Sequence, residues 1–291
     1  MAVVDASSAQ LETVALAPVR RGVWLDRIRT WVPAGVVVLL LVVCFLGPTL
    51  LPLPKPTGGN VLDSGLGPFS SGHLLGTDSN GNDILSRLIY GGRSSLFVGI
   101  TVNLVGIVVG GTIGAISAYV GGIVDTLIMR GLDILIAFPS LVLTLAVAQS
   151  LGPSTRNTIF ALAFFSIPAV ARIARSSTLR LREMPFMQAA QLCGSPGWRI
   201  LLRHVAPNIG PQLISFAALG MGIVIVTEGA LSFLGLGIPA PAPSWGNMIF
   251  DGQQSLSATP LEVIWPSLAL LITVLAFNQL GETLRARWSG R

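Results

Sequence analysis

Six apolar stretches, each long enough to cross a lipid bilayer, constrain the fold of this chain more than any other feature. A helix needs about 20 apolar residues to span the hydrocarbon core. The stretches lie at about 33–51, 95–119, 133–151, 157–174, 209–231 and 262–280. Charged residues make up only 11% of the 291 residues and lie mostly between the stretches. The sequence therefore predicts an all-α membrane protein with six transmembrane helices.

The basic residues predict how the chain is oriented in the membrane. If the N-terminus is cytoplasmic, alternation of the loops places 14 of the 18 lysines and arginines on the cytoplasmic side. Only Lys55, Arg87, Arg93 and Arg156 fall outside. Cytoplasmic loops of membrane proteins carry an excess of basic residues, so we expect both termini to be cytoplasmic. The net charge of +5 then reflects membrane orientation and requires no nucleic acid partner.

The spans divide the chain into segments with expected locations. In chain order these are a cytoplasmic N-terminal tail at 1–30, the first transmembrane helix at 31–52, an extracytoplasmic loop at 53–94, a five-helix core at 95–280 that includes a cytoplasmic segment at 175–208, and a cytoplasmic C-terminal tail at 281–291. The N-terminal tail is too long and too charged for a cleavable signal, so the first helix should remain as an anchor. Within the loop, helical spacing at 83–90 predicts a short surface helix capped by Ser79 or Asn80.

A stripe of small residues runs through the second span. Gly106, Gly110 and Gly114 are spaced by four residues, so they share one face of a helix. Such a stripe lets a neighbouring helix approach closely, which matters in lipid because packing must hold helices together there. The neighbour is either a helix of the same subunit or a helix of another subunit, and the spacing favours neither.

The residues that catalysis or metal binding would need are missing or separated. A Walker phosphate loop requires a lysine after glycine, but the only lysine, Lys55, lies between two prolines. His73 and His204 are expected on opposite sides of the membrane, and Cys44 and Cys193 in different environments. We therefore expect no enzyme activity, no metal site, no cofactor and no disulfide in this chain.

Polar residues inside the spans are candidates for a translocation path. Glu228 is the only deeply placed ionisable residue, and a carboxylate in a membrane is costly enough to mark a cavity, a partner or a proton path. The alternative is a structural carboxyl that is hydrogen-bonded to Thr227 and a neighbouring helix. Asn103 and Asn278 are further polar groups that face either helix contacts or an aqueous lumen.

The segment after the fourth span predicts a cytoplasmic helix–turn–helix. In it, Gln188, Ala189 and Ala190 form a low-profile helical surface, Gly194 reverses the chain, Ile200 is an apolar anchor and Pro207 ends the second helix. Helices of about ten residues are marginal in water alone. We therefore expect the segment to dock into a groove of a soluble partner. The alternative is a loop that lies on the membrane surface.

These residues resemble the C-type permease subunits of dipeptide and oligopeptide ABC importers. The cytoplasmic motif of that family begins Glu-Ala-Ala, has a glycine four residues after the second alanine, and continues to an isoleucine and a proline. The two alanines, the glycine, the isoleucine and the proline match Ala189, Ala190, Gly194, Ile200 and Pro207. Further matches are His73–Asp78 with Asp83–Arg87 and Gly92-Arg93, the region of Asp125 and Asp133, and Glu228–Gly237 with Pro243–Gly246. Two positions depart from the family pattern: Gln188 replaces the usual glutamate, and Asn82 replaces the usual arginine.

The resemblance implies a type I ABC importer permease fold in the bacterial inner membrane. It also implies the partners: a second, B-type permease, one fused or two separate ATP-binding subunits that hold ATP and Mg²⁺, and an extracytoplasmic peptide-binding protein. The cytoplasmic segment would then couple the ATPases to half of a peptide path. The rival hypotheses are a proton-coupled carrier that uses Glu228 as its relay, and a membrane scaffold that recruits a soluble partner.

Overall fold

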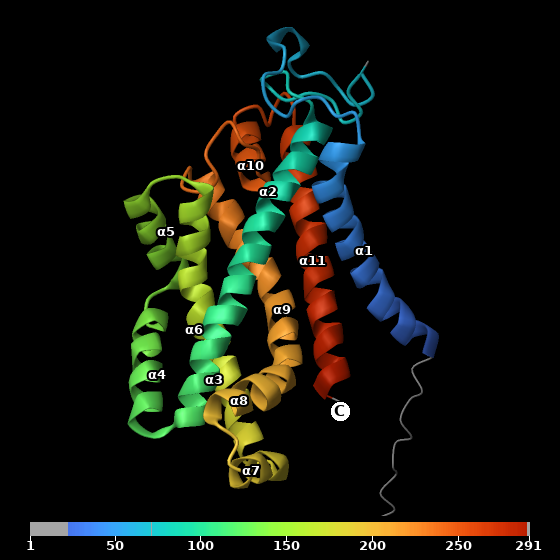
Figure 1. The fold of residues 1–291 in the computed structure, drawn as a ribbon. Coiled ribbons are helices and arrows are strands. Elements are labelled where there is room, and N and C mark those ends of the chain that lie inside the picture. Colours follow the sequence, from blue (N-terminus) through green and yellow to red (C-terminus); the bar gives the residue numbers. More distant parts are fainter. Residues whose placement is uncertain (1–22, 71, 290–291) are drawn as a thin grey trace, which may run out of the picture.

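The computed structural model describes residues 23–70 and 72–289, and within these ranges the chain is a helical bundle without a β-strand (Figure 1). In chain order the longer helices are α1 (Val23–Leu50), α2 (Ile84–Val105), α3 (Gly111–Val120), α4 (Gly122–Ile136), α5 (Ser140–Leu151), α6 (Thr155–Arg182), α7 (Pro185–Leu192), α9 (Ala206–Phe233), α10 (Trp245–Gln253) and α11 (Leu261–Ser289). The short elements are the 3₁₀ turn η1 (Val61–Asp63), the π-helical turns η2 (Gly106–Gly110) and η3 (Leu201–Val205), and α8 (Gly197–Ile200).

Five of the described helices are long and apolar enough to cross a membrane. They are Trp31–Leu50, Ile84–Val120, Thr155–Arg182, Gly197–Phe233 and Leu261–Trp288. The predicted third span, 133–151, differs from the prediction because α4 and α5 meet at an angle of 84°. Pro139 lies in this break, where it has no N–H to continue a helix. The described bundle reaches six spans only if α4 and α5 count together as one broken span.

The second span begins earlier than the sequence pattern indicated. Helix α2 starts at Ile84 and continues through η2 and α3 to Val120, so the predicted surface helix at 83–90 is the first part of a long helix. Its cap is Asp83, whose carboxylate accepts a hydrogen bond from the Ser86 backbone N–H at 2.7 Å. The proposal of Ser79 or Asn80 as the cap was therefore wrong.

The two ends of the bundle differ in structure (Figure 1). The loop end carries residues 51–70 and 72–83, which form an irregular layer, and α10. The hairpin end carries α7 and α8. Helix α1 begins and helix α11 ends toward the hairpin end. Most of the predicted tail at 281–291 belongs to α11, whereas residues 1–22 of the predicted tail at 1–30 lie outside the described part of the chain.

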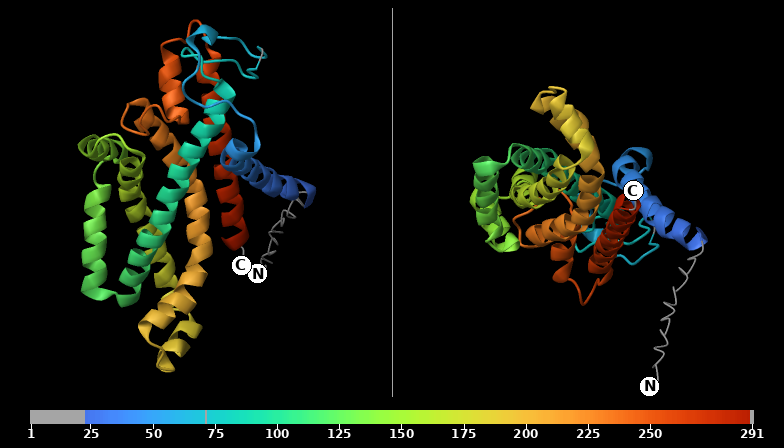
Figure 2. Two further views of the ribbon diagram at one scale, coloured as in Figure 1. Left: turned by 45° about the horizontal axis from the view of Figure 1, so that its top comes forward. Right: turned by 90° about the horizontal axis from the view of Figure 1, so that it is seen from below.

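Helices α4 and α1 lie at opposite edges of the bundle when it is viewed along its length (Figure 2). Buried residues between them form three apolar clusters. One joins α1, α2, α9, α10 and α11, one joins α2, α5, α6 and α9, and one lies at the hairpin end. The hairpin-end cluster consists of Ala115, Val170, Ala174, Met187, Ile200, Val205, Ile209 and Leu213. It positions the candidate site described below.

The small-residue stripe packs inside this subunit, against α6. A side chain at Gly106 would meet Ser166, and one at Gly110 or Gly114 would meet the backbone of α6 at Ile167 and Ala171. The glycines therefore allow two helix backbones to approach each other directly. Of the two interpretations that the spacing left open, the structure supports contact within the chain.

Replacing Gly114 by alanine should destabilise the protein. The added methyl group would clash with the Ala171 carbonyl oxygen, a backbone atom that cannot rotate away, and overpacking of this kind costs about 1–3 kcal/mol. Gly131 in α4 is the matched control, because nothing lies within 4 Å of an added Cβ there. Thermal unfolding in detergent should show a lower midpoint for Gly114→Ala and no loss for Gly131→Ala. Equal midpoints would contradict the packing assignment.

Candidate functional site

The candidate site is the α7–α8 hairpin, formed by α7, α8 and η3. Helix α7 starts with Pro185, whose fixed φ suits the first turn of a helix, and ends after eight residues. The chain then turns through Gly194 and enters α8 after Pro196. Helix α8 continues through η3 into α9. The hairpin is thus attached directly to two long helices, α6 before it and α9 after it.

Gly194 stops α7 by a specific turn. Its φ is +70°, a left-handed conformation in which side chains with a Cβ are disfavoured. The Ser195 N–H donates to the Ala190 carbonyl at 3.2 Å, and the Gly194 N–H donates to the Gln191 carbonyl at 2.9 Å. These two bonds are a Schellman motif, which satisfies carbonyls that the end of a helix would leave unpaired. The predicted chain reversal therefore has a defined geometry.

The inner face of the hairpin belongs to the core of the chain. Met187, Ile200 and Val205 are fully buried in the hairpin-end cluster. Ile200 was predicted as an apolar anchor for a partner, but its burial directs it inward, where it holds the hairpin against the bundle. Pro207 was predicted to end the second helix, but the helix continues past it from Gly197 to Phe233, and Pro207 directly follows the π-helical turn η3.

Contacts to α3 also hold the hairpin in place. The Arg182 guanidinium, at the end of α6, donates to the Ala118 carbonyl at 3.0 Å. A side chain at Gly197 would lie 3.0 Å from the Tyr119 ring, so the glycine allows α8 to approach α3. The rings of Phe186 and His204, 6.3 Å apart, connect α7 to η3. The close approach of α8 to α3 and the buried inner face therefore hold the hairpin against the bundle.

The outer face of the hairpin is exposed; it is uncharged along α7, whereas the second arm carries the exposed Arg199 and Arg203. Gln188, Ala189, Cys193 and Gly194 are exposed, and Ala190 is half-buried. Beside them Leu192 is 89% exposed. Trp198 and Leu202 are exposed on the second arm. Exposed apolar side chains gathered around a low-profile helix are typical of an interaction surface. The structure thus brings the predicted coupling residues together, except for Ile200 and Pro207.

Glu228 does not face an open path within this chain. Its side chain is fully buried in α9, and its carboxylate accepts a hydrogen bond from the Ser232 hydroxyl at 2.7 Å. The other carboxylate oxygen, Oε2, is buried and has no hydrogen-bond partner among the described residues. The partner is therefore Ser232 of the same helix, and not Thr227, whose hydroxyl donates to the Ile223 carbonyl at 2.8 Å.

The two asparagines also lie at helix contacts. The amide of Asn103 is buried and donates to the Gly99 carbonyl at 2.9 Å, and a side chain at Gly220 of α9 would lie 3.1 Å from its Oδ1. Asn278 of α11 is half-buried in the corresponding position beside Gly222. Glycines on α9 therefore make room for both amides. Glu228, Asn103 and Asn278 are not gathered on one surface.

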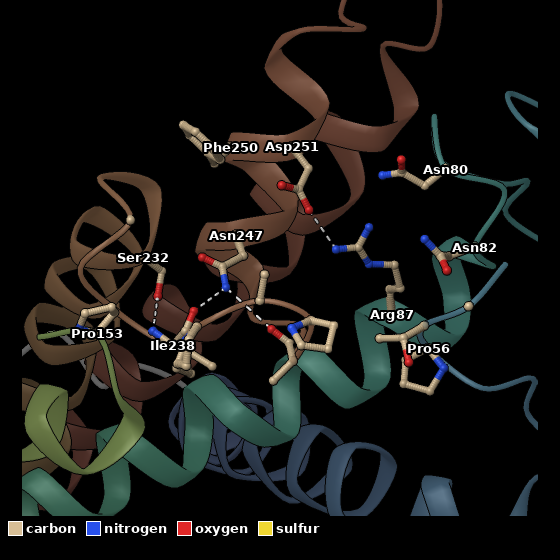
Figure 3. Close-up of a pocket in the computed structure, with 17 residues that line it drawn as sticks. Pro56, Asn80, Asn82, Arg87, Pro153, Ser232, Ile238, Asn247, Phe250 and Asp251 are labelled. Carbon is tan, nitrogen blue, oxygen red and sulfur yellow. Dashed lines mark hydrogen bonds and ion pairs between the residues drawn. The ribbon is translucent and has the colours of Figure 1, made fainter. Parts of the chain in front are cut away.

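The loop end carries a polar pocket that sequence reasoning did not identify (Figure 3). It is an open cavity of about 530 Å³, and Asn80, Asn82, Arg87, Asn247 and Asp251 contribute polar side chains to its lining. Arg87 of α2 and Asp251 of α10 point toward each other at 2.8 Å. The signal was present in the sequence, because Arg87 belongs to one of the stretches that resemble the permease family.

Arg87 also pairs with the buried carboxylate of Asp78 in the loop-end layer. Asn82 joins this network: its amide donates to Asp78 at 2.9 Å, and its oxygen accepts from the Gly59 N–H at 2.8 Å. Asn82, which departs from the family pattern, therefore stabilises the loop-end layer with both its amide nitrogen and its amide oxygen. Among the described residues, no three His, Cys, Asp or Glu side chains are grouped as a metal site.

Comparisons with known proteins agree with this architecture. The glutathione transport system permease protein GsiD of Pectobacterium atrosepticum is 41% identical over 255 residues, which cover 87% of this chain and 84% of the relative. The dipeptide transport system permease protein DppC of Alkalihalophilus pseudofirmus is 41% identical over 216 residues, covering 74% and 71%.

A solved structure shows the same fold at low sequence identity. A chain of the MetNI methionine ABC transporter in an inward-facing conformation superposes with a TM-score of 0.54 at 18% identity, covering 68% of this chain and 95% of that one. Residues 106–288 match the family described as the binding-protein-dependent transport system inner membrane component. The resemblance seen in the sequence is confirmed, and the chain belongs to this family of ABC transporter permease subunits.

Proposed function

We propose that this chain forms half of the translocation path of an ATP-driven importer for short peptides, and that the α7–α8 hairpin is its docking site for the ATPases. The exposed outer face of the hairpin, held by a buried inner face, carries this proposal. The relatives named for dipeptide and glutathione transport support the substrate class. As a permease subunit the chain is not an enzyme, and ATP and Mg²⁺ bind to the partners.

The hairpin end is the cytoplasmic side in this proposal. Helix α1 begins and helix α11 ends on that side (Figure 1), so both termini would also be cytoplasmic. The excess of arginines in the predicted cytoplasmic loops supports the same orientation. The loop end, with the pocket around Arg87 and Asp251, would then face the extracytoplasmic space of a bacterial inner membrane protein.

The physical role of the ATPases is to supply the free energy of gating. To move a gate from 1:99 to 99:1 requires about 5.5 kcal/mol of differential binding. A pair of ATPases that closes on nucleotide provides such a source if it moves the hairpin as a rigid body. The braces from Met187, Ile200 and Val205 favour rigid movement, because the hairpin cannot shift without its attached helices.

The remaining partners are a second, B-type permease that completes the path, one fused or two separate ATP-binding subunits, and an extracytoplasmic peptide-binding protein. Gln188 lies on the exposed face in place of the glutamate usual in the family. An amide of similar length keeps the shape of the docking surface and removes one negative charge. At position 188, docking should therefore depend more on shape and apolar contact than on a salt bridge.

The native Cys193 allows a direct test of ATPase docking. It is exposed at the end of α7, whereas Cys44 is buried. In membranes that contain the whole importer, a cross-linker with a maleimide at one end and a photoreactive diazirine at the other should join Cys193 to a protein that carries a Walker phosphate loop, as identified by mass spectrometry. The adduct should disappear in Cys193→Ser, and its yield should change with nucleotide. Adducts that never contain an ATP-binding subunit would contradict the proposal.

Gly194 should be required for coupling. At φ +70°, a valine introduces backbone strain of about 1–3 kcal/mol, whereas asparagine tolerates the left-handed conformation. We expect Gly194→Val to assemble with its partners but to lose most ATP-driven uptake of a labelled dipeptide in vesicles, and Gly194→Asn to retain most of it. Full uptake by the valine variant would show that the turn does not transmit motion.

Glu228→Gln distinguishes the importer from a proton-coupled carrier. Glutamine has the same shape and can still accept the Ser232 hydrogen bond, so the importer should keep uptake within about twofold of the wild type. A carrier that relays protons through Glu228 should stop. A protonophore added at constant ATP gives an independent check, because it should spare the importer. A scaffold that only recruits a partner would show no flux in either experiment.

A further inference from the structure

A charged, open pocket lies between α4 and α6. Asp133 of α4 pairs with Arg172 of α6 at 2.6 Å. Asp125 accepts two hydrogen bonds from Arg175, at 2.7 and 2.6 Å. With Thr126, Met129 and Arg130 these side chains line an open cavity of about 500 Å³. We refer to it as the α4–α6 pocket.

The pocket is not part of the core. No residue of α4 is buried in the described chain, and the side chains of Arg172 and Asp133 are 48% and 42% exposed. Both residues lie at the ends of the apolar stretches at 133–151 and 157–174, toward the side expected to be cytoplasmic. Charged groups at such a position face water or the bundle interior, because lipid cannot solvate them. We therefore expect water on this face of the chain where the pair lies.

Helix α4 separates this polar face from an apolar one. Asp125, Met129 and Asp133 follow each other at four-residue spacing and line the pocket. Leu127 and Ile134 lie on roughly the opposite side, about 160° and 140° from Met129 at 100° per residue. Both are apolar and exposed, Leu127 by 67%. One face of α4 thus suits water and the other suits lipid or another helix.

The chemistry of the pocket matches a molecule with one positive and one negative end. A free peptide at neutral pH carries an ammonium and a carboxylate. If its carboxylate pairs with Arg172 and its ammonium with Asp133, two ion pairs replace the one that was broken. No charge is left unpaired at any point. Binding of this kind is favourable enough to admit a solute and weak enough to release it, as conduction along a path requires.

We propose that the α4–α6 pocket is an aqueous part of the peptide path and transiently binds the two charged ends of a zwitterionic peptide. The inference rests on the proposed function as a peptide importer and assigns the path to a different face of the chain from Glu228, Asn103 and Asn278. It also gives a role to the region of Asp125 and Asp133, which the proposed function left unexplained.

Thiol labelling tests whether water reaches the pocket. In a Cys193→Ser background, Met129→Cys places a thiol in the pocket and Leu127→Cys places one on the opposite face, about 3 Å nearer the start of α4. Everted vesicles with the whole importer are treated with a membrane-impermeant cationic methanethiosulfonate. We expect Met129→Cys to react at least about tenfold faster, because only a hydrated thiol ionises.

Two labelling results would overturn the proposal. Equal rates at the two positions would mean that the pocket is no wetter than the apolar face. A change in the rate at Met129→Cys relative to Leu127→Cys when anionic lipids are replaced by neutral lipids would show that a lipid headgroup, and not the peptide path, occupies the pocket. In the expected case, modification at Met129→Cys also blocks peptide uptake, whereas treatment of Leu127→Cys does not.

Neutralising the charges tests the peptide contact itself. Arg172→Gln and Asp133→Asn should each lower uptake of a labelled dipeptide several-fold, and the double variant should stay low because both contacts are missing. Recovery of uptake in the double variant would show that the pair only holds α4 to α6 and would overturn the binding role. Nucleotide-dependent cross-linking at the native Cys193 in otherwise unchanged single and double variants confirms that the complexes are assembled.

Failure of this inference can be told apart from failure of the proposed function. If wild-type vesicles with the binding protein and ATP take up no peptide, the proposed function fails whatever the labelling shows. If wild-type uptake is normal but Met129→Cys does not react faster than Leu127→Cys, only the position of the path is wrong.

Discussion

The burial of Met187, Ile200 and Val205 in one cluster is the contact on which the functional interpretation depends. A helix as short as α7 has little stability of its own in water. Packing against α6 and α9 gives it a fixed position, and the Gly194 turn aims its uncharged outer face away from the bundle. A partner that moves this surface must therefore move the long helices as well. Without the cluster, the hairpin would have no fixed position and would transmit no motion.

The sequence predicted the fold class and the hairpin well because both follow from local rules. Apolar stretches of sufficient length predict helices in lipid, where every backbone polar group must be satisfied within the segment. The left-handed turn at Gly194 followed from residue type. The ends of the individual helices were less predictable. Helix α2 continues into the polar segment before 95 because Asp83 caps it there, and the break between α4 and α5 separates a stretch that hydropathy alone reads as continuous.

The functional roles of polar residues were harder to predict, since hydropathy does not show which way a side chain points. Glu228 and Asn103 lie in apolar spans and were interpreted as candidates for the path, yet both are buried and hydrogen-bonded to groups of their own helices. Asp133 and Arg172 lie at the ends of spans, where charges raise no suspicion, yet they face outward. Ile200 was interpreted as a contact for a partner protein because it is apolar, but an apolar residue in a hairpin can equally pack against the core of its own chain, as Ile200 does.

Helix α9 extends from the braced hairpin to the loop end and has 28 residues, so it is about 42 Å long. A rod of this length that pivots by about 10° near its middle displaces its two ends by about 3–4 Å in opposite directions. One tilting motion of a single helix would then widen the bundle at one end and narrow it at the other. The bundle could therefore not be open on both sides of the membrane at the same time, and no residue would have to unfold to prevent this.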